Sequence, residues 1–549
     1  MRSPLVAPGP EFGVVPGIGE GPGGPRRPPF AKVLVANRGE IALRVMRACR
    51  ELGVSTVAVY SDADRTARHV RYADEAYLLG PAPSARSYLR IDRLIDIARQ
   101  SGAEAVHPGY GFLAENADFV EACEAAGLVF VGPGSRAMRL LGSKTEARRV
   151  MLAADVPVIR GSGPLADADQ ARWEGERLGY PVMVKAAAGG GGKGMRQVEA
   201  PAEMGEAFVA AKAEAAAAFG DDTVYLEKVV VRPRHVEFQV LADVHGAAIH
   251  LGERECSLQR RHQKLIEESP CAVVTPELRA RMGAVAVRAV LAAGYVNAGT
   301  VEFLVDADGD FSFLEVNARL QVEHPVTELV TGIDLVKAQL RLAAGGALGL
   351  RQEEVVFRCA ALECRICAED PFADFLPSVG EVTDLVEPAG PGVRLESALE
   401  PGQQITPYYD PLIAKLVTWG ADRDEAIARM RRALAEYRIQ GVTTTIPFHQ
   451  RVMDDEQFAA ADIDTGYVDR RFPELPPRGP ERAAGGRDVG RSSVEVAAVV
   501  AAVLGQRPAL VRLLDRAPAG GAAAQEVGRK VGDPWPAAAR RDARRWGGD

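Results

Sequence analysis

A glycine-rich segment with two lysines could bind a chain of phosphates. The segment Gly189-Gly-Gly-Gly-Lys193-Gly-Met195 follows a short apolar run that ends at Lys185. Consecutive backbone N–H groups next to a lysine suit a polyphosphate. The segment is not a Walker A loop, because it contains no Gly-Lys-Ser/Thr and would give magnesium no hydroxyl ligand. A glycine hairpin or linker is the alternative, but a linker would not be flanked by a buried strand and two lysines.

A second group of residues could bind a divalent metal ion. The pattern at 301–317 predicts a β-hairpin with strands at 301–305 and 311–317. Glu302 lies on the first strand, while Glu315 and Asn317 point to one face of the second. Mg²⁺ takes oxygen ligands and usually keeps substrate phosphates as well, so these residues predict a metal–nucleotide site. The alternative is a solvated sheet edge, but both glutamates interrupt apolar runs, where an unpaired carboxylate would be costly.

Two charged segments could bind a small anion. Residues 254–268 read RECSLQRRHQKLIEE and concentrate basic residues at 260–264. A nucleic-acid groove is disfavoured, because acids flank the basic residues and no aromatic side chains interleave them. A solvated charged loop is the other interpretation. The segment 319–325 adds a cation, an amide and the carboxylate of Glu323 directly after the metal candidates.

Three cysteines superficially resemble the ligands of an iron–sulfur cluster. Cys359, Cys364 and Cys367 are close in sequence, but a fourth thiolate is needed nearby and none follows. They fall in a stretch of alternating apolar residues. We therefore predict that they are buried strand cysteines.

The elements that must position these residues begin with a β–α alternation. Apolar runs at 33–36 and 54–60 flank a segment whose apolar residues at 41, 45 and 49 have helical spacing. The alternation continues to about residue 133 and predicts a parallel, doubly wound sheet. The first turn, at 37–39, has one glycine where a dinucleotide fingerprint needs three, so a nicotinamide-binding domain is disfavoured.

Near Pro181 the pattern changes to alternating segments, which predict an antiparallel α+β middle domain. A last mixed segment covers about 355–470. The predicted fold class is thus α/β and α+β, in several domains. Beyond residue 473, proline, glycine, alanine and arginine dominate.

Composition excludes several classes of protein. The chain has 549 residues, a formal net charge of −8 and 47% hydrophobic residues, as in an ordinary enzyme of several domains. No apolar run approaches the roughly 18 residues that a membrane helix needs, and a mildly acidic chain gains little from nucleic acid. The first 29 residues are rich in proline and glycine and lack the apolar core of a secretory signal. Seven irregularly spaced cysteines predict no disulfide framework, which favours the cytoplasm.

Several motifs jointly resemble biotin carboxylase, the ATP-grasp component of biotin-dependent carboxylases. The resemblance covers about residues 30–472, and the motifs stand in the family's order: KVLVANRGEIALRV, HPGYGFLAENADF, GGGGKGM, ERECSLQRRHQKLIEE, LEVNARLQVEHPVTE, ECRICAEDP and PYYDPLIAKLV. Other ATP-grasp ligases share the glycine loop and the metal pair but lack QRRHQK and RLQVEHPVTE. The resemblance implies a Rossmann-like N-terminal domain (30–140), an ATP-grasp domain (141–350, glycine-rich lid at about 157–230) and a biotin carboxylase C-terminal domain (355–472). Composition predicts a disordered leader (1–29), or a start codon assigned too early, and a partly disordered tail (473–549).

The resemblance also implies roles for individual residues. Catalysis would depend on the general base Glu323 with Arg319, Lys264 and Arg365, the last of which would steady the biotin enolate. ATP would be bound by Lys144, Lys185, Gly190, Gly191, Gly192, Glu227, Lys228, His235, Gln259 and His262. Bicarbonate would be held by Lys264, Arg319, Gln321 and Val322. Magnesium or manganese would be bound by Glu302, Glu315 and Asn317.

The implied reaction is the ATP- and bicarbonate-dependent carboxylation of biotin through carboxyphosphate, the first half-reaction of an acyl-CoA carboxylase. Biotin would be attached to a separate carrier protein, since the sequence contains no Met-Lys-Met tripeptide of the carrier type. Carboxyltransferase subunits and a second copy of this chain, in a homodimer, are the other implied partners. Two alternatives stay open: another carboxylate–amine ligase of the ATP-grasp class, and an inactive scaffold of a carboxylase complex.

Overall fold

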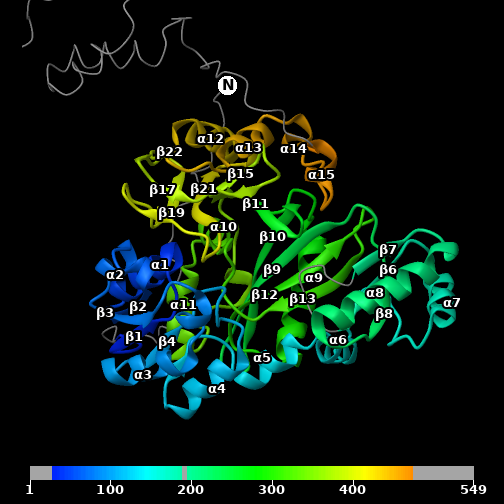
Figure 1. The fold of residues 1–549 in the computed structure, drawn as a ribbon, viewed down its shortest axis with the longest axis horizontal. Coiled ribbons are helices and arrows are strands. Elements are labelled where there is room, and N and C mark those ends of the chain that lie inside the picture. The colour runs from blue at the N-terminus through cyan, green and yellow to red at the C-terminus, as the bar shows by residue number, and fades with distance from the viewer. Residues whose placement is uncertain (1–27, 188–194, 474–549) are drawn as a thin grey trace, which may run out of the picture. The chain divides into compact units, whose positions relative to one another are not determined.

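The computed structural model describes residues 28–187 and 195–473, and the first part of the chain forms a parallel sheet (Figure 1). Its strands lie in the order β3-β2-β1-β4-β5, and every pairing is parallel. The strands are β1 (Lys32–Val35), β2 (Ser55–Ser61), β3 (Glu75–Gly80), β4 (Ala105–His107) and β5 (Val129–Phe130). The helices are α1 (Gly39–Glu51), α2 (Arg68–Tyr72), α3 (Ile91–Ser101), α4 (Ala117–Ala125) and α5 (Ser135–Gly142), with short 3₁₀ turns η1 (Asp62–Asp64) and η2 (Ser84–Arg86).

Both faces of this sheet are covered, as the sequence predicts. Val33 and Val35 of β1 pack in one apolar cluster with Ile41 of α1. Leu34, between them, packs in another cluster with Leu94 of α3. A parallel strand buried on both faces needs such a continuous apolar run. The doubly wound sheet is therefore confirmed.

The strand order reverses between β1 and β4, and the loops after these two strands meet there. Asn37, just after β1, donates hydrogen bonds from Nδ2 to the carbonyls of Pro108 and Tyr110, each at 2.7 Å. In open α/β sheets, ligands bind at the carboxyl ends of strands beside such a switch point. At this point the hydroxyl of Tyr110 donates a hydrogen bond to Glu40 of α1.

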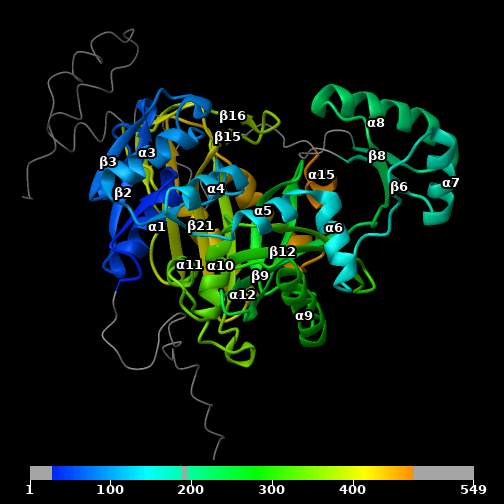
Figure 2. The same ribbon diagram turned by 90° about the horizontal axis from the view of Figure 1, so that it is seen from below.

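A separate three-stranded antiparallel sheet follows, in the order β7-β6-β8. It consists of β6 (Val182–Ala186), β7 (Met195–Val198) and β8 (Val224–Lys228), with α7 (Ala168–Leu178), η3 (Pro201–Glu203) and α8 (Met204–Phe219). Figure 2 shows α7 and α8 beside this sheet, with which they share an apolar cluster. The register pairs Lys185 with Tyr225 and Met183 with Glu227. Lys185, Tyr225 and Glu227 therefore lie on one face of the small sheet.

The largest sheet has eight strands in the order β13-β12-β9-β10-β11-β14-β21-β19, all antiparallel. The strands are β9 (Arg234–Ala242), β10 (Ala248–Arg260), β11 (Gln263–Ser269), β12 (Asn297–Val305), β13 (Phe311–Asn317), β14 (Ala360–Cys367), β19 (Val393–Ser397) and β21 (Leu412–Gly420). The predicted hairpin at 301–317 corresponds to β12 and β13. Helices of this region are α6 (Lys144–Ala153), α9 (Pro276–Ala292), α10 (His324–Thr331) and α11 (Leu335–Ala343), followed by the turn η4 (Gln352–Glu354).

This sheet runs across the position at which the sequence suggests a boundary between the middle and the last domain. β11 pairs with β14, where Ile266 lies opposite Cys364 and Glu267 lies opposite Glu363. The strands β14, β21 and β19 thereby extend the sheet of the middle region. Side chains from the last segment therefore reach the same surface as those of β11.

The rest of the described chain packs against that end of the sheet. The helices are α12 (Arg423–Glu436), α13 (Ile446–Met453), α14 (Glu456–Ala459) and α15 (Tyr467–Arg471). Short strands pair as β15 (Glu369–Asp370) with β16 (Leu376–Pro377), β17 (Gly380–Glu381) with β20 (Gln404–Ile405), and β18 (Asp384–Val386) with β22 (Arg438–Gln440). Met430 and Leu434 of α12 share an apolar cluster with Cys364 and Leu416.

The three neighbouring cysteines lie in or beside β14. All seven are free thiols, and Cys364 and Cys367 are buried residues of β14, as predicted. Cys359 is half-buried just before that strand.

No helix within the described ranges is long and apolar enough to cross a membrane. Apart from residues 28, 29 and 473, the predicted leader (1–29) and tail (473–549) lie outside the described residues.

Candidate functional site

The site is built around Lys264, near the start of β11. Its Nζ donates hydrogen bonds to three carboxylates: Glu237 at 2.6 Å, Glu323 at 2.8 Å and Glu302 at 2.9 Å. All three carboxylates are buried. Burial would lower the pKa of the lysine, but the three negative charges raise this pKa well above its ordinary value. Lys264 therefore stays a cation at the centre of an anionic cluster.

Glu323 is held between two cations. Its Oε1 accepts a hydrogen bond from Lys264 and its Oε2 accepts one from Nη2 of Arg365, both at 2.8 Å. The residue immediately precedes α10, whose N-terminal dipole favours negative charge. Burial would raise the pKa of this carboxyl, but Lys264 and Arg365 hold it well below its ordinary value. Glu323 is thus an ionised carboxylate, able to accept a proton from a bound ligand.

Glu302 and Glu315 face each other on β12 and β13. The register pairs these two residues directly and puts Asn317 on the same face. Oε1 of Glu302 accepts hydrogen bonds from Asn317 at 2.8 Å and from Gln321 at 3.1 Å. Its Oε2 lies 2.8 Å from Nε2 of His235. The hairpin thus brings the three metal candidates of the sequence together.

The charges of these two carboxyls favour a cation between them. Burial raises the pKa of Glu315, and the negative charge of Glu302 raises it further. Burial would also raise the pKa of Glu302, but Lys264 and His235 hold it below its ordinary value. A divalent cation would offset the repulsion between the two groups, and Mg²⁺ prefers oxygen ligands of this kind. The residues present therefore fit a magnesium site.

The loop between β13 and α10 carries Arg319 and Gln321. Arg319 donates from Nε to Glu115 at 2.9 Å, from Nη2 to Asn317 at 3.0 Å and from Nη1 to Oε1 of Gln321 at 3.2 Å. The same loop ends at Val322 and Glu323. A guanidinium and an amide therefore lie within one short loop of the buried carboxylate, an arrangement that suits a small planar oxyanion.

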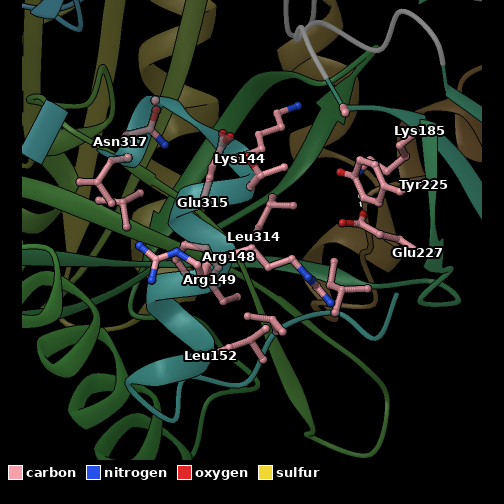
Figure 3. Close-up of a pocket in the computed structure, with 18 of the residues that line it drawn as sticks. Lys144, Arg148, Arg149, Leu152, Lys185, Tyr225, Glu227, Leu314, Glu315 and Asn317 are labelled. Atoms are coloured by element: carbon pink, nitrogen blue, oxygen red, sulfur yellow. Dashed lines mark hydrogen bonds and ion pairs between the residues drawn. The ribbon is translucent and has the colours of Figure 1, made fainter. Parts of the chain in front are cut away.

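A cavity of about 570 Å³ extends from Glu315 and Asn317 to the small sheet (Figure 3). One wall is α6, which contributes Lys144, Arg148 and Arg149, and the opposite wall carries Lys185, whose Nζ donates to Glu227 at 2.6 Å. Apolar side chains complete the lining: Met138, Leu141, Leu152, Val158, Ile159, Phe313, Leu314 and Val316. Apolar walls with several cations suit a ligand that has an aromatic part and a phosphate chain.

The structure places other predicted nucleotide contacts away from this lining. Lys228 donates to the backbone carbonyls of residues 179 and 180, at 2.7 and 3.0 Å. Gln259 is buried on β10 opposite Lys264, whereas His262 is exposed at the β10–β11 turn. The glycines Gly190, Gly191 and Gly192 lie outside the described residues.

Sequence reasoning missed several buried charges that support the site. Arg254, fully buried, donates from Nε to Glu237 at 2.5 Å. Glu267 accepts a hydrogen bond from Nε of Arg365 at 2.6 Å. The available signal was a charged residue inside an otherwise apolar strand, because such residues are rarely buried without a partner. Glu237 in β9 and Glu267 in β11 both fit that signal.

A nucleotide-sized cavity between a small antiparallel sheet and a larger one that carries metal-type carboxylates is the arrangement of an ATP-grasp ligase. Comparison with known families agrees with this class. Residues 143–351 match the family model "Carbamoyl-phosphate synthase L chain, ATP binding domain". Residues 29–138 match "Biotin carboxylase, N-terminal domain", and residues 363–470 match "Biotin carboxylase C-terminal domain".

Relatives are similar to this chain over most of their length. A pyruvate carboxylase subunit of Methanothermobacter thermautotrophicus is 55% identical over 442 residues, which are 80% of this chain and 90% of that protein. Biotin carboxylase of Nostoc sp. is 52% identical over 440 residues, 80% of this chain and 98% of that protein.

Solved structures give the same result. One is the complex of Campylobacter jejuni biotin carboxylase with β-γ-ATP. It has a TM-score of 0.77 and 48% identity, and the match covers 80% of this chain and 99% of that one. The biotin carboxylase domain dimer of Hydrogenobacter thermophilus 2-oxoglutarate carboxylase, solved with MgADP, ADP and bicarbonate, has a TM-score of 0.76 and 48% identity over 80% of this chain and 98% of that one. The chain belongs to the biotin carboxylase family, which confirms the resemblance seen in its motifs. The members of this family are ATP-dependent ligases, and neither alternative function is favoured.

Proposed function

We propose that this protein carboxylates biotin on a carrier protein, using ATP and bicarbonate, with carboxyphosphate as the intermediate. The observation that carries the proposal is Glu323, a buried and ionised carboxylate held at 2.8 Å by both Lys264 and Arg365. It ends the loop that also presents Arg319 and Gln321. A base beside an oxyanion site is what the activation of bicarbonate requires, because bicarbonate must lose its proton to attack a phosphorus atom.

In this proposal Arg319, Gln321 and the backbone of Val322 hold bicarbonate in line with the γ-phosphate of ATP. Glu323 takes the proton, an oxygen of bicarbonate forms the bond to phosphorus, and ADP leaves with the electrons of the broken P–O bond. Lys264 and Arg365 hold the pKa of Glu323 low. When bicarbonate binds beside Lys264, its negative charge offsets part of this effect, so the pKa of Glu323 rises and the carboxylate becomes a stronger base.

The second step transfers the carboxyl group. Carboxyphosphate breaks down to carbon dioxide and phosphate, and phosphate removes the proton from the ureido nitrogen of biotin. That nitrogen then attacks carbon dioxide and forms the new C–N bond. Arg365 lies beside Glu323 and stabilises the negative charge that develops on the ureido oxygen.

We assign the cavity to ATP. Lys144 and Lys185 line it and would contact the phosphates, with His235 and the metal acids nearby. The other nucleotide contacts proposed from the resemblance are Glu227, Lys228, Gln259, His262 and the glycines 190–192. Glu302, Glu315 and Asn317 would hold Mg²⁺, which offsets charge on the transferred phosphoryl group.

The proposed domain organisation follows the same resemblance. We place the N-terminal domain at 30–140, the ATP-grasp domain at 141–350 and the C-terminal domain at 355–472. The family matches at 29–138, 143–351 and 363–470 support these limits.

An ATPase assay tests the function. We expect the purified chain to hydrolyse ATP only when magnesium and bicarbonate are both present, and faster when free biotin is added. Phosphate release is measured with each component omitted in turn. Equal rates with and without bicarbonate would contradict the proposal, and a requirement for an amine in place of biotin would indicate a carboxylate–amine ligase.

We further propose that biotin arrives on a separate carrier protein, that carboxyltransferase subunits use the product, and that the chain forms a homodimer in the cytoplasm. The relatives that match nearly end to end are named as one subunit of a carboxylase or as biotin carboxylase alone, which supports a separate carrier. The free cysteines fit a reducing compartment.

On an avidin blot of the native complex we expect no biotinylated band at 58.6 kDa but a smaller biotinylated protein that co-purifies. A biotinylated band at 58.6 kDa would refute the separate carrier.

A further inference from the structure

Lys415, in the middle of β21, is a buried cation to which the proposed mechanism gives no role. Its side chain has 0% exposure, although a lysine is costly to bury without partners. Its Nζ donates a hydrogen bond to the backbone carbonyl of Val322 at 2.9 Å. The same Nζ lies 3.3 Å from Oε1 of Glu40 and 5.7 Å from the centre of the Tyr110 ring. The lysine thus joins the last segment of the chain to the N-terminal sheet region and to the loop that ends at Glu323.

The sheet register shows why this contact matters for the site. Lys415 and Arg365 are direct cross-strand partners in β21 and β14, so their side chains leave the same face of the sheet. Arg365 binds the carboxylate of Glu323, and Lys415 binds the carbonyl of the preceding residue, Val322. Two neighbouring cations therefore hold one peptide unit and the side chain that follows it.

Glu40 provides the counter-charge that makes this lysine tolerable. Its carboxylate also accepts a hydrogen bond from the hydroxyl of Tyr110. Burial raises the pKa of Glu40 to about 7, and the charge of Lys415 opposes that rise. The ion pair satisfies the charge of the lysine, whereas the hydrogen bond to Val322 fixes the loop. The two contacts can therefore be separated by mutation.

We propose that Lys415 is a positioning residue for bicarbonate: its ammonium group fixes the Val322–Glu323 peptide, so that the Val322 backbone and the Glu323 carboxylate both meet the anion. This inference rests on the proposed function, because it assigns the loop 319–323 to bicarbonate. ATP is bound by other elements, so the loss of Lys415 acts on the binding of bicarbonate and spares that of ATP.

The test compares Michaelis constants in the full-length protein. For Lys415→Met, which keeps the length of the side chain and removes the donor, we expect the KM for bicarbonate to rise at least about tenfold, as for the loss of a buried charged hydrogen bond. The KM for ATP should change by less than about twofold. In Glu40→Gln, which removes the counter-charge and keeps the lysine, the KM for bicarbonate should stay within about threefold of the original.

A double variant separates positioning from folding. Lys415→Met alone removes the cation beside the buried Glu40 and should lower the melting temperature, but Glu40→Gln/Lys415→Met removes both members of the ion pair together and should restore that temperature. If the lysine positions the loop, the double variant keeps the raised KM for bicarbonate. A normal KM in either variant that lacks Lys415 would overturn the inference. Failure of the unmodified protein to depend on bicarbonate would instead overturn the proposed function.

Discussion

Glu323→Gln should lower bicarbonate-dependent ATP cleavage by about a hundredfold to ten-thousandfold, the usual contribution of a general base. The amide has nearly the volume of the carboxylate but cannot accept the proton of bicarbonate. Nucleotide affinity should stay near normal, because Glu323 contacts Lys264 and Arg365 and is not part of the cavity lining. Phosphate release and the equilibrium binding of a fluorescent ATP analogue measure the two effects separately.

Glu363 offers a matched control for this substitution. It is a fully buried glutamate on β14, two residues from Arg365, and neither of its carboxyl oxygens has a hydrogen-bond partner among the described residues. Burial raises its pKa well above the ordinary value, which favours the uncharged form of the carboxyl group. Glu363→Gln keeps nearly the volume of the side chain and removes no hydrogen bond between described residues, so it should keep most of the activity. A comparable loss in both variants would show that the effect of Glu323→Gln is structural.

The parts of the site that could be predicted from the sequence are those with a local pattern. Glu302, Glu315 and Asn317 lie on one hairpin, and the period of two along a strand was enough to put them on one face. Arg319 and Glu323 follow within the same short segment. Neighbours in sequence become neighbours in space there, because the hairpin and the loop to α10 leave the chain little freedom.

The contacts that give Glu323 its charge could not be predicted in this way. Lys264 and Arg365 reach Glu323 across 59 and 42 positions of sequence. Arg365 is itself held by Glu267 across 98 positions, through the pairing of β11 with β14. Long-range strand pairing depends on the packing of the whole sheet and has no local signature. The same pairing makes the sheet continuous across the position at which the sequence suggests a domain boundary. The motif resemblance assigns a role to Arg365, whereas its partner Glu267 lies within the motif ERECSLQRRHQKLIEE but receives no role from the resemblance.

Arg365→Met should depress biotin-dependent carboxylation by at least about tenfold, which corresponds to about 1.4 kcal/mol of transition-state stabilisation. ATP cleavage that depends on bicarbonate alone should fall by less than about threefold. The reason is that Lys264 still holds Glu323 at 2.8 Å when Arg365 is absent, whereas no other cation replaces the guanidinium beside biotin in our proposal. Carboxybiotin formed from labelled bicarbonate and ADP released without biotin measure the two activities.

The variant should fold, since the carboxyl group that loses its partner can become neutral. Burial raises the pKa of Glu267 to about 7 even though Arg365 lowers it, so removal of the arginine leaves this group protonated at neutral pH. Arg423 provides the matched control, because it donates to the neighbouring Glu268 at 2.6 Å. Arg423→Met should lower stability and leave the ratio of the two activities unchanged. A parallel loss of both activities in Arg365→Met would show that the arginine acts by holding Glu323 for the first step rather than by stabilising charge on biotin in the second.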